Sequence, residues 1–350
     1  MMIGRLRSRA GAIAGIAGAG IVIAGALAGC SSSGATADRG ASPPPEQRVI
    51  TVDAVPAAEE GGLYVAQAQG FFAQFGLTVK INSITGAGSG IPDLQAGHAQ
   101  LVAGNYVPFI MAQRAGSFDH KPVSIRIIAA GSEIQPGSEA LYVLPHSRFQ
   151  TLAELARAHA RIGLDGADDS GDMMVGALLA QAGYPLGDVR QVTTAAGFPA
   201  LLGLLSSGRV DAAWLPQPLG ETAEQRMGAL PLADFDQGSL QDFPLTGYLG
   251  STQWVRAHPA TVAAFLGALN EGQRLADTDR AAVESAMEQY TDVPPVIADT
   301  MAMDSYPLEM DGPQLQRVAD SMYEFGLTPG AKAPFQVAGM IQPEPEPGGG

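Results

Sequence analysis

Short apolar runs rich in β-branched residues alternate with helix-like segments from residue 48 onward. The expected strands lie at 49–52, 78–81, 100–102, 124–129, 161–164, 189–193 and 210–214. The expected helices lie at 62–69, 91–96, 107–114, 172–182, 199–207 and 259–275, and a further helix opens with the capping box at 151–154. Since parallel strands are joined by crossovers that usually contain a helix, this alternation predicts an α/β fold with largely parallel sheets.

An internal similarity favours two lobes. Residues 94–102 and 205–213 share a helix end, a glycine and a strand. The chain has 350 residues, of which 46% are hydrophobic and 16% charged, which is enough apolar material for a sizeable core.

The charge balance excludes one class of partner. The net charge is −15, and it would become −18 without residues 1–29, which contain Arg5, Arg7 and Arg9 but no acidic residue. Such an acidic surface repels phosphate backbones, so we expect no nucleic acid partner. The single cysteine, Cys30, rules out a disulfide within the chain and a cysteine-rich metal cluster.

The N-terminus has the pattern of an export signal. Three arginines precede an uncharged apolar run from 10 to 29, which ends in Leu27-Ala28-Gly29-Cys30. This ending resembles the bacterial lipobox, so residues 1–29 are predicted to be a lipoprotein signal peptide and Cys30 the lipidated residue. The alternative is an uncleaved transmembrane helix. The Pro- and Ser-rich segment 30–47 is expected to be a flexible tether, and 341–350 a disordered tail.

Several segments resemble one family of solute-binding proteins. They are Leu63 to Leu77 (LYVAQAQGFFAQFGL), Leu94 to Gly97, Gly208 to Ala212, Gly247 to Ser251 and Trp254 to Phe265. The family is the NMT1/THI5-like group, which serves uptake of nitrate, sulfonates, taurine and thiamine precursors. The similarity covers most of residues 48–330.

The resemblance implies a fold of the periplasmic-binding-protein type II kind: two α/β lobes with a ligand cleft between them, closing by hinge motion. Mapped onto this chain, lobe 1 is 48–132 plus 240–340 and lobe 2 is 133–239. It also implies a small-molecule solute, partner ABC permease and ATPase subunits, and a monomer. With Cys30, the expected location is the extracytoplasmic face of the membrane, held by the lipid.

Residues at expected strand ends and helix starts are the candidate ligand-binding residues, because open α/β sheets bind ligands there. They are Glu60, Gly86, Gly88, Ser89, Asn105, Tyr106, Glu133, Asp169, Ser170, Gly171, Trp214 and Gln217. Structural alternatives stay open for most of them. The segment 86–90 can be a tight turn, Asp169 or Ser170 can cap a helix, Trp214 can pack in the core, and 59–60 can be a solvated loop.

The charge of these segments indicates a type of ligand. Glu60, Glu133, Asp168, Asp169 and Asp172 are acidic, whereas no Arg or Lys lies in the candidate segments. A sulfonate or nitrate needs hydrogen-bond donors or a cation, while an amine suits carboxylates and aromatic faces. We therefore expect a neutral or cationic nitrogenous ligand, such as a pyrimidine-like or zwitterionic compound.

The sequence gives no sign of a catalytic or metal site. The fungal pyrimidine-synthesising relatives of the family carry a cysteine-rich iron motif, and the only cysteine here is the predicted anchor. The five histidines are scattered without metal-binding spacing, and 86–90 lacks a hydrolase serine elbow. We expect a binding protein without a cofactor; the alternative is an exported enzyme or sensor that uses the same scaffold.

Overall fold

The computed structural model describes residues 43–343 except 119, 120, 123, 168 and 195. The segment from Pro43 onward is one compact unit. The predicted signal peptide and Cys30 therefore lie outside the described residues, as does Asp168. None of the helices in the described part of the chain is both long and apolar enough to cross a membrane.

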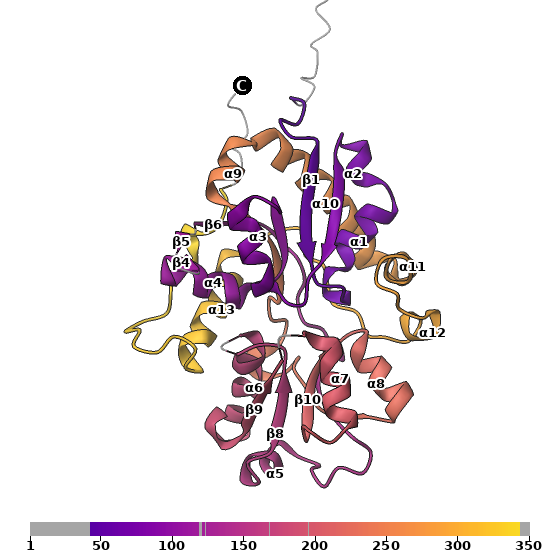
Figure 1. The fold of residues 1–350 in the computed structure, drawn as a ribbon, viewed down its shortest axis with the longest axis vertical. Helices are drawn as coiled ribbons and strands as arrows, with labels where there is room; N and C mark the ends of the chain where they lie inside the picture. Colours follow the sequence, from indigo (N-terminus) through magenta and orange to yellow (C-terminus); the bar gives the residue numbers. More distant parts are fainter. Residues whose placement is uncertain (1–42, 119–120, 123, 168, 195, 344–350) are drawn as a thin grey trace, which may run out of the picture. The chain divides into compact units, whose positions relative to one another are not determined.

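The first sheet has five strands in the order β2-β1-β3-β12-β6. These are β1 (Val49–Ala54), β2 (Thr78–Ser83), β3 (Leu101–Asn105), β6 (Ile125–Ala130) and β12 (Thr246–Ser251). β1 runs parallel to β2 and β3, so all three end at the same edge of the sheet. This sheet and its helices are called the first lobe below, and Figure 1 shows it in the upper half of the view.

The second sheet also has five strands, in the order β11-β7-β10-β8-β9. They are β7 (Glu139–Val143), β8 (Arg161–Leu164), β9 (Arg190–Thr193), β10 (Ala212–Pro216) and β11 (Leu230–Asp234). The parallel strands β8, β9 and β10 again end at one edge. This sheet, with its helices, is called the second lobe. A separate two-stranded ribbon joins β4 (Ser117–Phe118) to β5 (Lys121–Pro122).

The expectation of largely parallel sheets holds for four strands of each five-stranded sheet, while one strand of each, β12 and β7, runs in the opposite direction. In the first, β12 pairs antiparallel with β3 and β6; in the second, β7 pairs antiparallel with β10 and β11. The physical reason lies in the connections. The chain passes from the first sheet to the second between β6 and β7 and returns between β11 and β12, so the strands at these crossings enter without a βαβ crossover.

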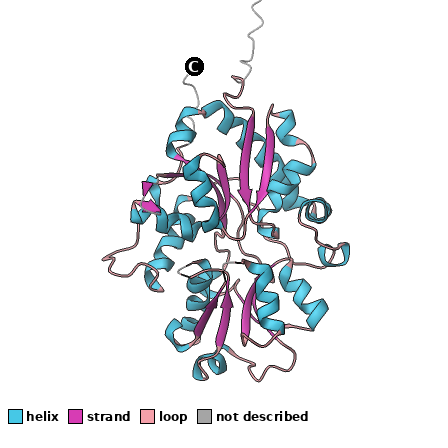
Figure 2. Ribbon diagram, in the orientation of Figure 1, coloured by secondary structure: helices cyan, strands magenta, loops and turns pink. Residues whose placement is uncertain are grey.

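Helices cover the faces of both sheets (Figure 2). Those of the first lobe are α1 (Gly61–Ala68), α2 (Phe71–Gln74), α3 (Ile91–Ala96), α4 (Tyr106–Ala115), α9 (Thr252–Ala257), α10 (Pro259–Thr278), α11 (Arg280–Tyr290), α12 (Pro295–Ala298) and α13 (Gly312–Glu324). Those of the second lobe are α5 (Leu152–Arg157), α6 (Ser170–Gln181), α7 (Phe198–Ser206) and α8 (Leu219–Met227). Short 3₁₀ turns are η1 (Ala58–Glu60), η2 (Ala87–Gly90), η3 (Leu186–Asp188), η4 (Gly238–Leu240) and η5 (Val337–Gly339).

The amphipathic pattern predicted for 259–275 is the core face of α10. Phe265 and Leu269 are fully buried, and Phe265 stacks on Phe72 of α2 with ring centroids 5.3 Å apart. The helix begins with Pro259 in its first turn, where a missing N–H costs nothing. The sequence pattern does not indicate β7, β11, α8, α11 or α13, so the antiparallel strand β7 is not expected from it. The other antiparallel strand, β12, falls in the segment Gly247 to Ser251 that carries the family resemblance.

The inner ends of the two expected flexible segments are ordered. Glu46 accepts hydrogen bonds from the backbone N–H groups of Ala260 and Thr261, at 3.0 and 2.8 Å, and so caps α10. Slight burial raises the pKa of Glu46, but these hydrogen bonds outweigh it and lower the pKa to about 2. At the other end, Ile341 bridges to Ile127 of β6. The flexible-segment prediction is therefore wrong at these two inner ends.

Candidate ligand-binding site

The ends of the parallel strands in the two lobes face each other. The N–H of Ala58, after β1, donates to the carbonyl of Gln217, after β10, at 3.0 Å. A Cβ at Gly197, the residue before α7, would lie 2.6 Å from the carbonyl oxygen of Thr85, after β2. A Cβ at Gly86 would lie 3.7 Å from Oδ2 of Asp165, after β8. The site is therefore built where strand ends and helix starts of both lobes meet.

Six acidic side chains converge on this region. We call them the carboxylate cluster: Glu59, Glu60, Glu139, Asp165, Asp169 and Asp304. Two come from η1 of the first lobe, three from the second lobe, and Asp304 from the loop after α12. Residues more than 240 positions apart in the chain thus bring negative charge to one place.

Glu59, on the first lobe, is the member of the cluster that lies near Asp304 and near the second-lobe acids Asp165 and Asp169. Its side chain is 1% exposed, and neither carboxylate oxygen has a hydrogen-bond partner among the described residues. Burial raises its pKa well above the ordinary value, and the charges of Asp304, Asp165 and Asp169 raise it further. Glu60, its neighbour, is fully buried, and burial together with the charge of Glu59 raises its pKa as well.

The second lobe supplies the opposing carboxylates. Glu139 starts β7 and accepts a hydrogen bond from Nε1 of Trp214, yet burial and the charge of Glu59 still raise its pKa. Asp165 follows β8 directly, and burial and the charge of Asp169 raise its pKa. Asp169 caps α6 by accepting from the Ser170 N–H at 2.6 Å; burial nevertheless raises its pKa to about 6.

Asp304 completes the cluster. It is 6% exposed, Ser138 donates a hydrogen bond to it, and its Oδ1 has no partner in the described part of the chain. Burial raises its pKa to about 7. Two full charges 4 Å apart near a protein surface repel by about 4 kcal/mol. The closed cluster therefore needs bound protons or a positively charged guest.

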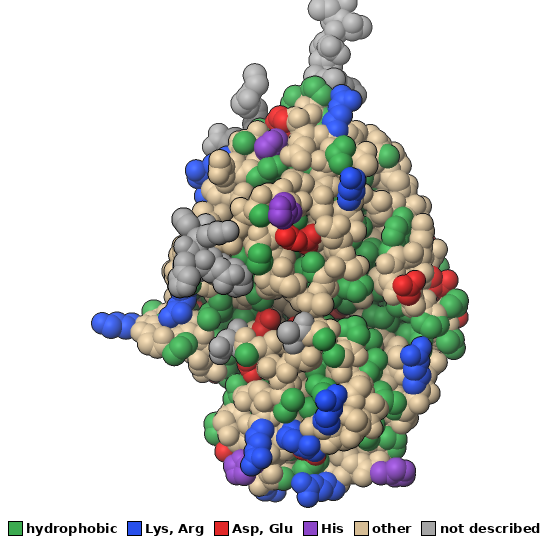
Figure 3. Space-filling model, viewed as in Figure 1, with side chains coloured by type: hydrophobic (Ala, Val, Ile, Leu, Met, Phe, Trp, Pro, Cys, Tyr) green, Lys and Arg blue, Asp and Glu red, His purple; other side chains and the backbone are tan. Residues whose placement is uncertain are grey.

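Most positive side chains lie elsewhere, although Arg226 of α8 lines a cavity near the cluster. Among the described residues, none of the ion pairs includes a member of the carboxylate cluster. Figure 3 shows Lys and Arg gathered at the far end of the second lobe. Arg148, Arg157 and Arg190 of this lobe are exposed. Arg161 begins β8 and Asp165 follows its other end, about 13 Å away at about 3.3 Å per residue. The strand thus separates the basic surface from the acidic site.

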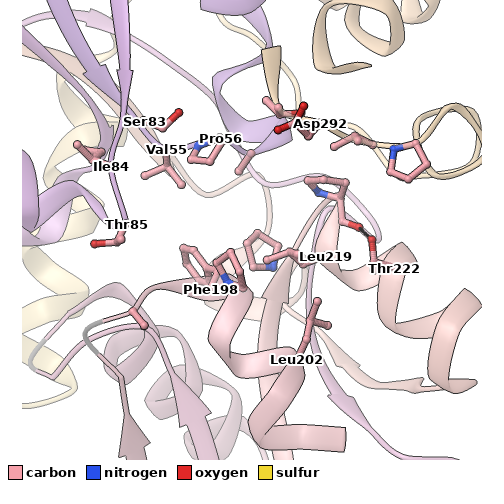
Figure 4. A pocket seen from close by; sticks show the side chains of 18 of the residues that line it. Val55, Pro56, Ser83, Ile84, Thr85, Phe198, Leu202, Leu219, Thr222 and Asp292 are labelled. Atoms are coloured by element: carbon pink, nitrogen blue, oxygen red, sulfur yellow. Dashed lines mark hydrogen bonds between the residues drawn. The ribbon is translucent and has the colours of Figure 1, made fainter. Parts of the chain in front are cut away.

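A mostly apolar cavity of about 480 Å³ lies near the carboxylate cluster, although none of the six acids lines it. Val55, Ile84, Phe198, Leu202 and Leu219 are among its lining residues, and Figure 4 shows them converging from both lobes. Ala57, two residues before Glu59, also lines it. Phe198 packs edge-on against Trp214, with ring centroids 4.9 Å apart, and Trp214 in turn binds Glu139. The lining also includes Arg226 and Asp292, so a solute in this cavity meets mainly apolar surface with one residue of each charge.

The structure brings some of the predicted site residues together. Glu60 and Asp169 belong to the carboxylate cluster, and the buried Ser170 is next to Asp169. Asn105 is 4% exposed at the end of β3, and its Nδ2 has no partner among the described residues. Tyr106 is buried, and burial together with the charge of Glu60 raises the pKa of its hydroxyl group.

Other predicted residues have structural roles. A Cβ at Gly171 would clash with the Trp214 ring at 2.8 Å, so this glycine allows α6 to pack on the core. Trp214 is fully buried, although its N–H reaches the carboxylate cluster. Gln217 uses its amide to bond the Gly137 carbonyl and the Glu221 N–H. Glu133 is near Asp242 and Arg317 instead of the cluster, and its backbone bridges to Ser305.

In the glycine-rich turn at 86–90, some predicted residues also have structural roles and one faces the cluster. The Ser89 hydroxyl is exposed and donates to the Gly86 carbonyl at 2.7 Å, which is the bonding of a tight turn. Gly88 packs towards Pro108. Only Gly86 faces the cluster, opposite Asp165.

Three members of the cluster were not recognised in the sequence. Glu139 opens the otherwise apolar strand EALYV, and Asp165 ends the strand RIGL, so a charge beside a buried strand was an available signal for both. Asp304 lies in an irregular loop, and only its tertiary position brings it to the site. The solvated loop that the sequence allows for residues 59–60 is wrong, because Glu59 and Glu60 are both buried.

The comparison with known families agrees with this architecture. The family model described as "NMT1/THI5 like" matches residues 58–279. The chain belongs to the NMT1/THI5-like family. No curated protein matches the chain. The resemblance seen in the sequence is therefore confirmed, and so is the two-lobed α/β fold, which solved structures share.

Solved structures similar to this NMT1/THI5-like protein are mostly binding proteins. The alkanesulfonate-binding protein SsuA of Xanthomonas axonopodis pv. citri, bound to MOPS, has a TM-score of 0.71 and 19% identity over 85% of this chain and 99% of its own. The periplasmic nitrate-binding protein NrtA of Synechocystis PCC 6803 has a TM-score of 0.71 and 15% identity over 82% and 84%. The desulfurization enzyme DSZB is also similar, with a TM-score of 0.57 and 17% identity over 80% and 92%. At these identities the similarity establishes the fold alone.

Proposed function

We propose that this protein is a membrane-anchored, extracytoplasmic solute receptor. It captures a small nitrogenous solute between its two lobes and delivers it to the permease and ATPase subunits of an ABC importer. Membership of the NMT1/THI5-like family and the fold shared with periplasmic binding proteins support this role.

The observation that carries the choice of solute is the buried carboxylate cluster. An anion such as a sulfonate would enter a site where acids from both lobes repel it, whereas a cation or a hydrogen-bond donor is attracted. The nearby, mostly apolar cavity is suited to the carbon skeleton of such a solute. The solute thus differs in charge from those named for the two similar binding proteins.

The anchor is the second part of the proposal. Cys30 receives a diacylglyceryl group, and residues 31–45 connect it to Glu46 on the first lobe. Two or more acyl chains hold a protein stably at a membrane, since each buried CH₂ contributes about 0.8 kcal/mol. The receptor works as a monomer beside its permease.

Two measurements test the receptor and its anchor. Native mass spectrometry of the purified protein identifies a co-purifying solute, and uptake of that labelled solute is then followed in a strain lacking the gene. We expect uptake to be lost on deletion, to return with the wild-type gene, and to return poorly with Cys30→Ser. Uptake that persists in the deletion strain would contradict the receptor role; full rescue by Cys30→Ser would contradict the need for the anchor.

Binding without turnover is the third part. An exported enzyme is the competing function, because the similar structures include one. After incubation at 37 °C with the co-purified solute, we expect the protein to release that solute unchanged on denaturation. A product of altered mass would favour the enzyme.

A further inference from the structure

We infer that the solute is an organic cation with at least two positively charged nitrogen groups, such as a diamine or a polyamine. This inference rests on the proposed receptor function and adds the charge of the solute to it. Its structural basis is the meeting of carboxylates from both lobes around the unpartnered side chain of Glu59.

The distribution of the carboxylates favours several positive groups over one. Glu59 and Glu60 lie on the first lobe, while Asp165, after β8, and Asp169, at the start of α6, lie on the second lobe. Glu139 is near Glu59, Asp304 and Asp165, because the charges of all three raise its pKa in addition to burial. One ammonium group can contact only a few oxygens at hydrogen-bond distance, so a single positive charge would leave the remaining acids uncompensated.

The burial of the Glu59 carboxylate without hydrogen bonds is a separate indication that a ligand binds here. A buried carboxylate without hydrogen bonds costs several kcal/mol, and native proteins avoid such groups unless they serve a function. Neither oxygen of Glu59 has a partner among the described residues, although the side chain is 1% exposed. A cationic N–H donor placed between the lobes would satisfy it.

An organic cation fits better than a metal ion. Within the described residues, no three side chains of His, Cys, Asp or Glu are grouped so that they could hold one metal ion. The acids are spread over the facing surfaces of two lobes, which matches a guest whose charges are separated by a carbon chain. The mostly apolar cavity near the cluster, whose lining includes Phe198 and Val55 besides Arg226 and Asp292, suits that chain.

The groups facing Glu59 set how binding depends on pH. They are the five other carboxylates of the cluster, together with Tyr64 and Tyr306. No Arg or Lys acts on Glu59 in the described part of the chain. The tyrosines stay neutral, because burial and nearby acids raise the pKa values of Tyr64 and Tyr306 well above their ordinary value. Carboxylates that hold protons in the empty site release them to a cation, so cation affinity rises with pH.

Calorimetric titration of the lipoprotein in detergent tests the inference. The probes are 1,4-diaminobutane, spermidine, the monoamine n-butylamine and the anion butane-1-sulfonate, each at pH 6 and pH 8. We expect at least one of the two polyamines to bind 10-fold or more tightly than butylamine, with a lower Kd at pH 8 and no binding of the sulfonate. Equal affinity for butylamine, binding of the sulfonate alone, or no binding of any amine would each overturn the inference.

Paired variants show whether Glu59 makes the contact. Glu59→Gln should weaken polyamine binding by 10-fold or more and raise the melting temperature of the empty protein at pH 8, since it removes a repelled charge. Glu288→Gln, on the exposed surface of α11, should change neither. A structural role for Glu59 would lower the melting temperature instead, and that result would count against the inference.

Native mass spectrometry separates this inference from the receptor proposal. If the polyamines fail but a neutral or anionic solute co-purifies, the receptor function stands and the inference on charge is wrong. If the polyamines fail and nothing co-purifies from the native host, both are contradicted.

Discussion

Trp214 illustrates how one residue serves both the core and the site. Its ring is fully buried and packs edge-on against Phe198 and Phe235, which is the alternative that the sequence left open. Its Nε1–H nevertheless donates to Glu139, a member of the carboxylate cluster. A pattern of residue types cannot separate these roles, because both place an aromatic residue at the end of a buried strand.

Replacing Trp214 by Phe should lower both stability and cation binding. The change leaves Glu139 buried without its donor, and an unsatisfied buried acceptor costs about 1–3 kcal/mol. The pKa of Glu139 should rise further, because the hydrogen bond now lowers it. Urea unfolding at pH 7 measures the free energy of unfolding, and calorimetry measures binding.

Trp254→Phe is the matched control. Its Nε1 donates to the neutral amide of Gln47, away from the site, at 2.9 Å. We expect a loss of about 1 kcal/mol and unchanged binding. If Trp214→Phe behaved like this control in both measurements, Glu139 would not depend on the indole donor.

At the scale of elements, the turn before α7 and the turn after β2 bring the two lobes into contact. Gly197 precedes α7 with φ of 70°, and its Cα faces the Thr85 carbonyl of the other lobe. Glycine is needed there twice, for the left-handed backbone and for the close approach. Because these two turns meet between the lobes, a side chain at position 197 should limit how closely the lobes approach each other.

Gly197→Ala should weaken ligand binding more than it lowers stability. The new Cβ would meet the Thr85 oxygen at 2.6 Å and hold the lobes apart, so we expect a 10-fold or greater rise in Kd. Gly183→Ala is the control, since Gly183 has φ of 83° but no atom within 4 Å of the added Cβ. Both variants should lose about 1 kcal/mol of stability from backbone strain. Equal Kd values for the two would show that the Gly197 contact has no part in closure.

The elements differ in how far the sequence predicts them. Strands such as β1 and helices such as α10 carry clear periodicity, and both were identified. β7 and β11 were missed because an apolar run such as EALYV, at the start of the second lobe, follows a proline- and glycine-rich crossover without a helix between. The antiparallel pairings depend on the return of the chain between lobes, which no local pattern records. The lobe boundaries at 132–133 and 239–240 stay a prediction.

At the scale of the whole molecule, charge is sorted by position. A chain with a net charge of −15 exposes arginines at the far end of the second lobe and buries carboxylates between the lobes. Of the acidic residues that the sequence offers for the site, Glu60 and Asp169 lie in the carboxylate cluster, whereas Glu133 does not. The sequence could not predict Asp304, which is brought to Glu59 from nearly 250 residues away by folding alone.

The empty protein should become less stable as pH rises. The pKa values of Asp169 and Asp304 are about 6 and 7 in the folded state, above the ordinary value of 3.8. The folded state therefore binds more protons than the unfolded state above pH 4, and stability falls as pH rises through these values. Each pKa unit corresponds to about 1.4 kcal/mol. Calorimetric melting at pH 5 and pH 8 should show the higher melting temperature at pH 5; the reverse order would mean that the cluster is ionised and compensated in the empty protein.

Small-angle X-ray scattering of the solute-free protein tests the central claim, that carboxylates of both lobes close on a positive guest. At pH 8 the ionised acids repel each other, so we expect a larger radius of gyration than at pH 5, and a return to the compact value when the polyamine is added at pH 8. The same compaction should be absent with butane-1-sulfonate. A radius of gyration that ignored both pH and the polyamine, or that shrank with the sulfonate, would contradict the account.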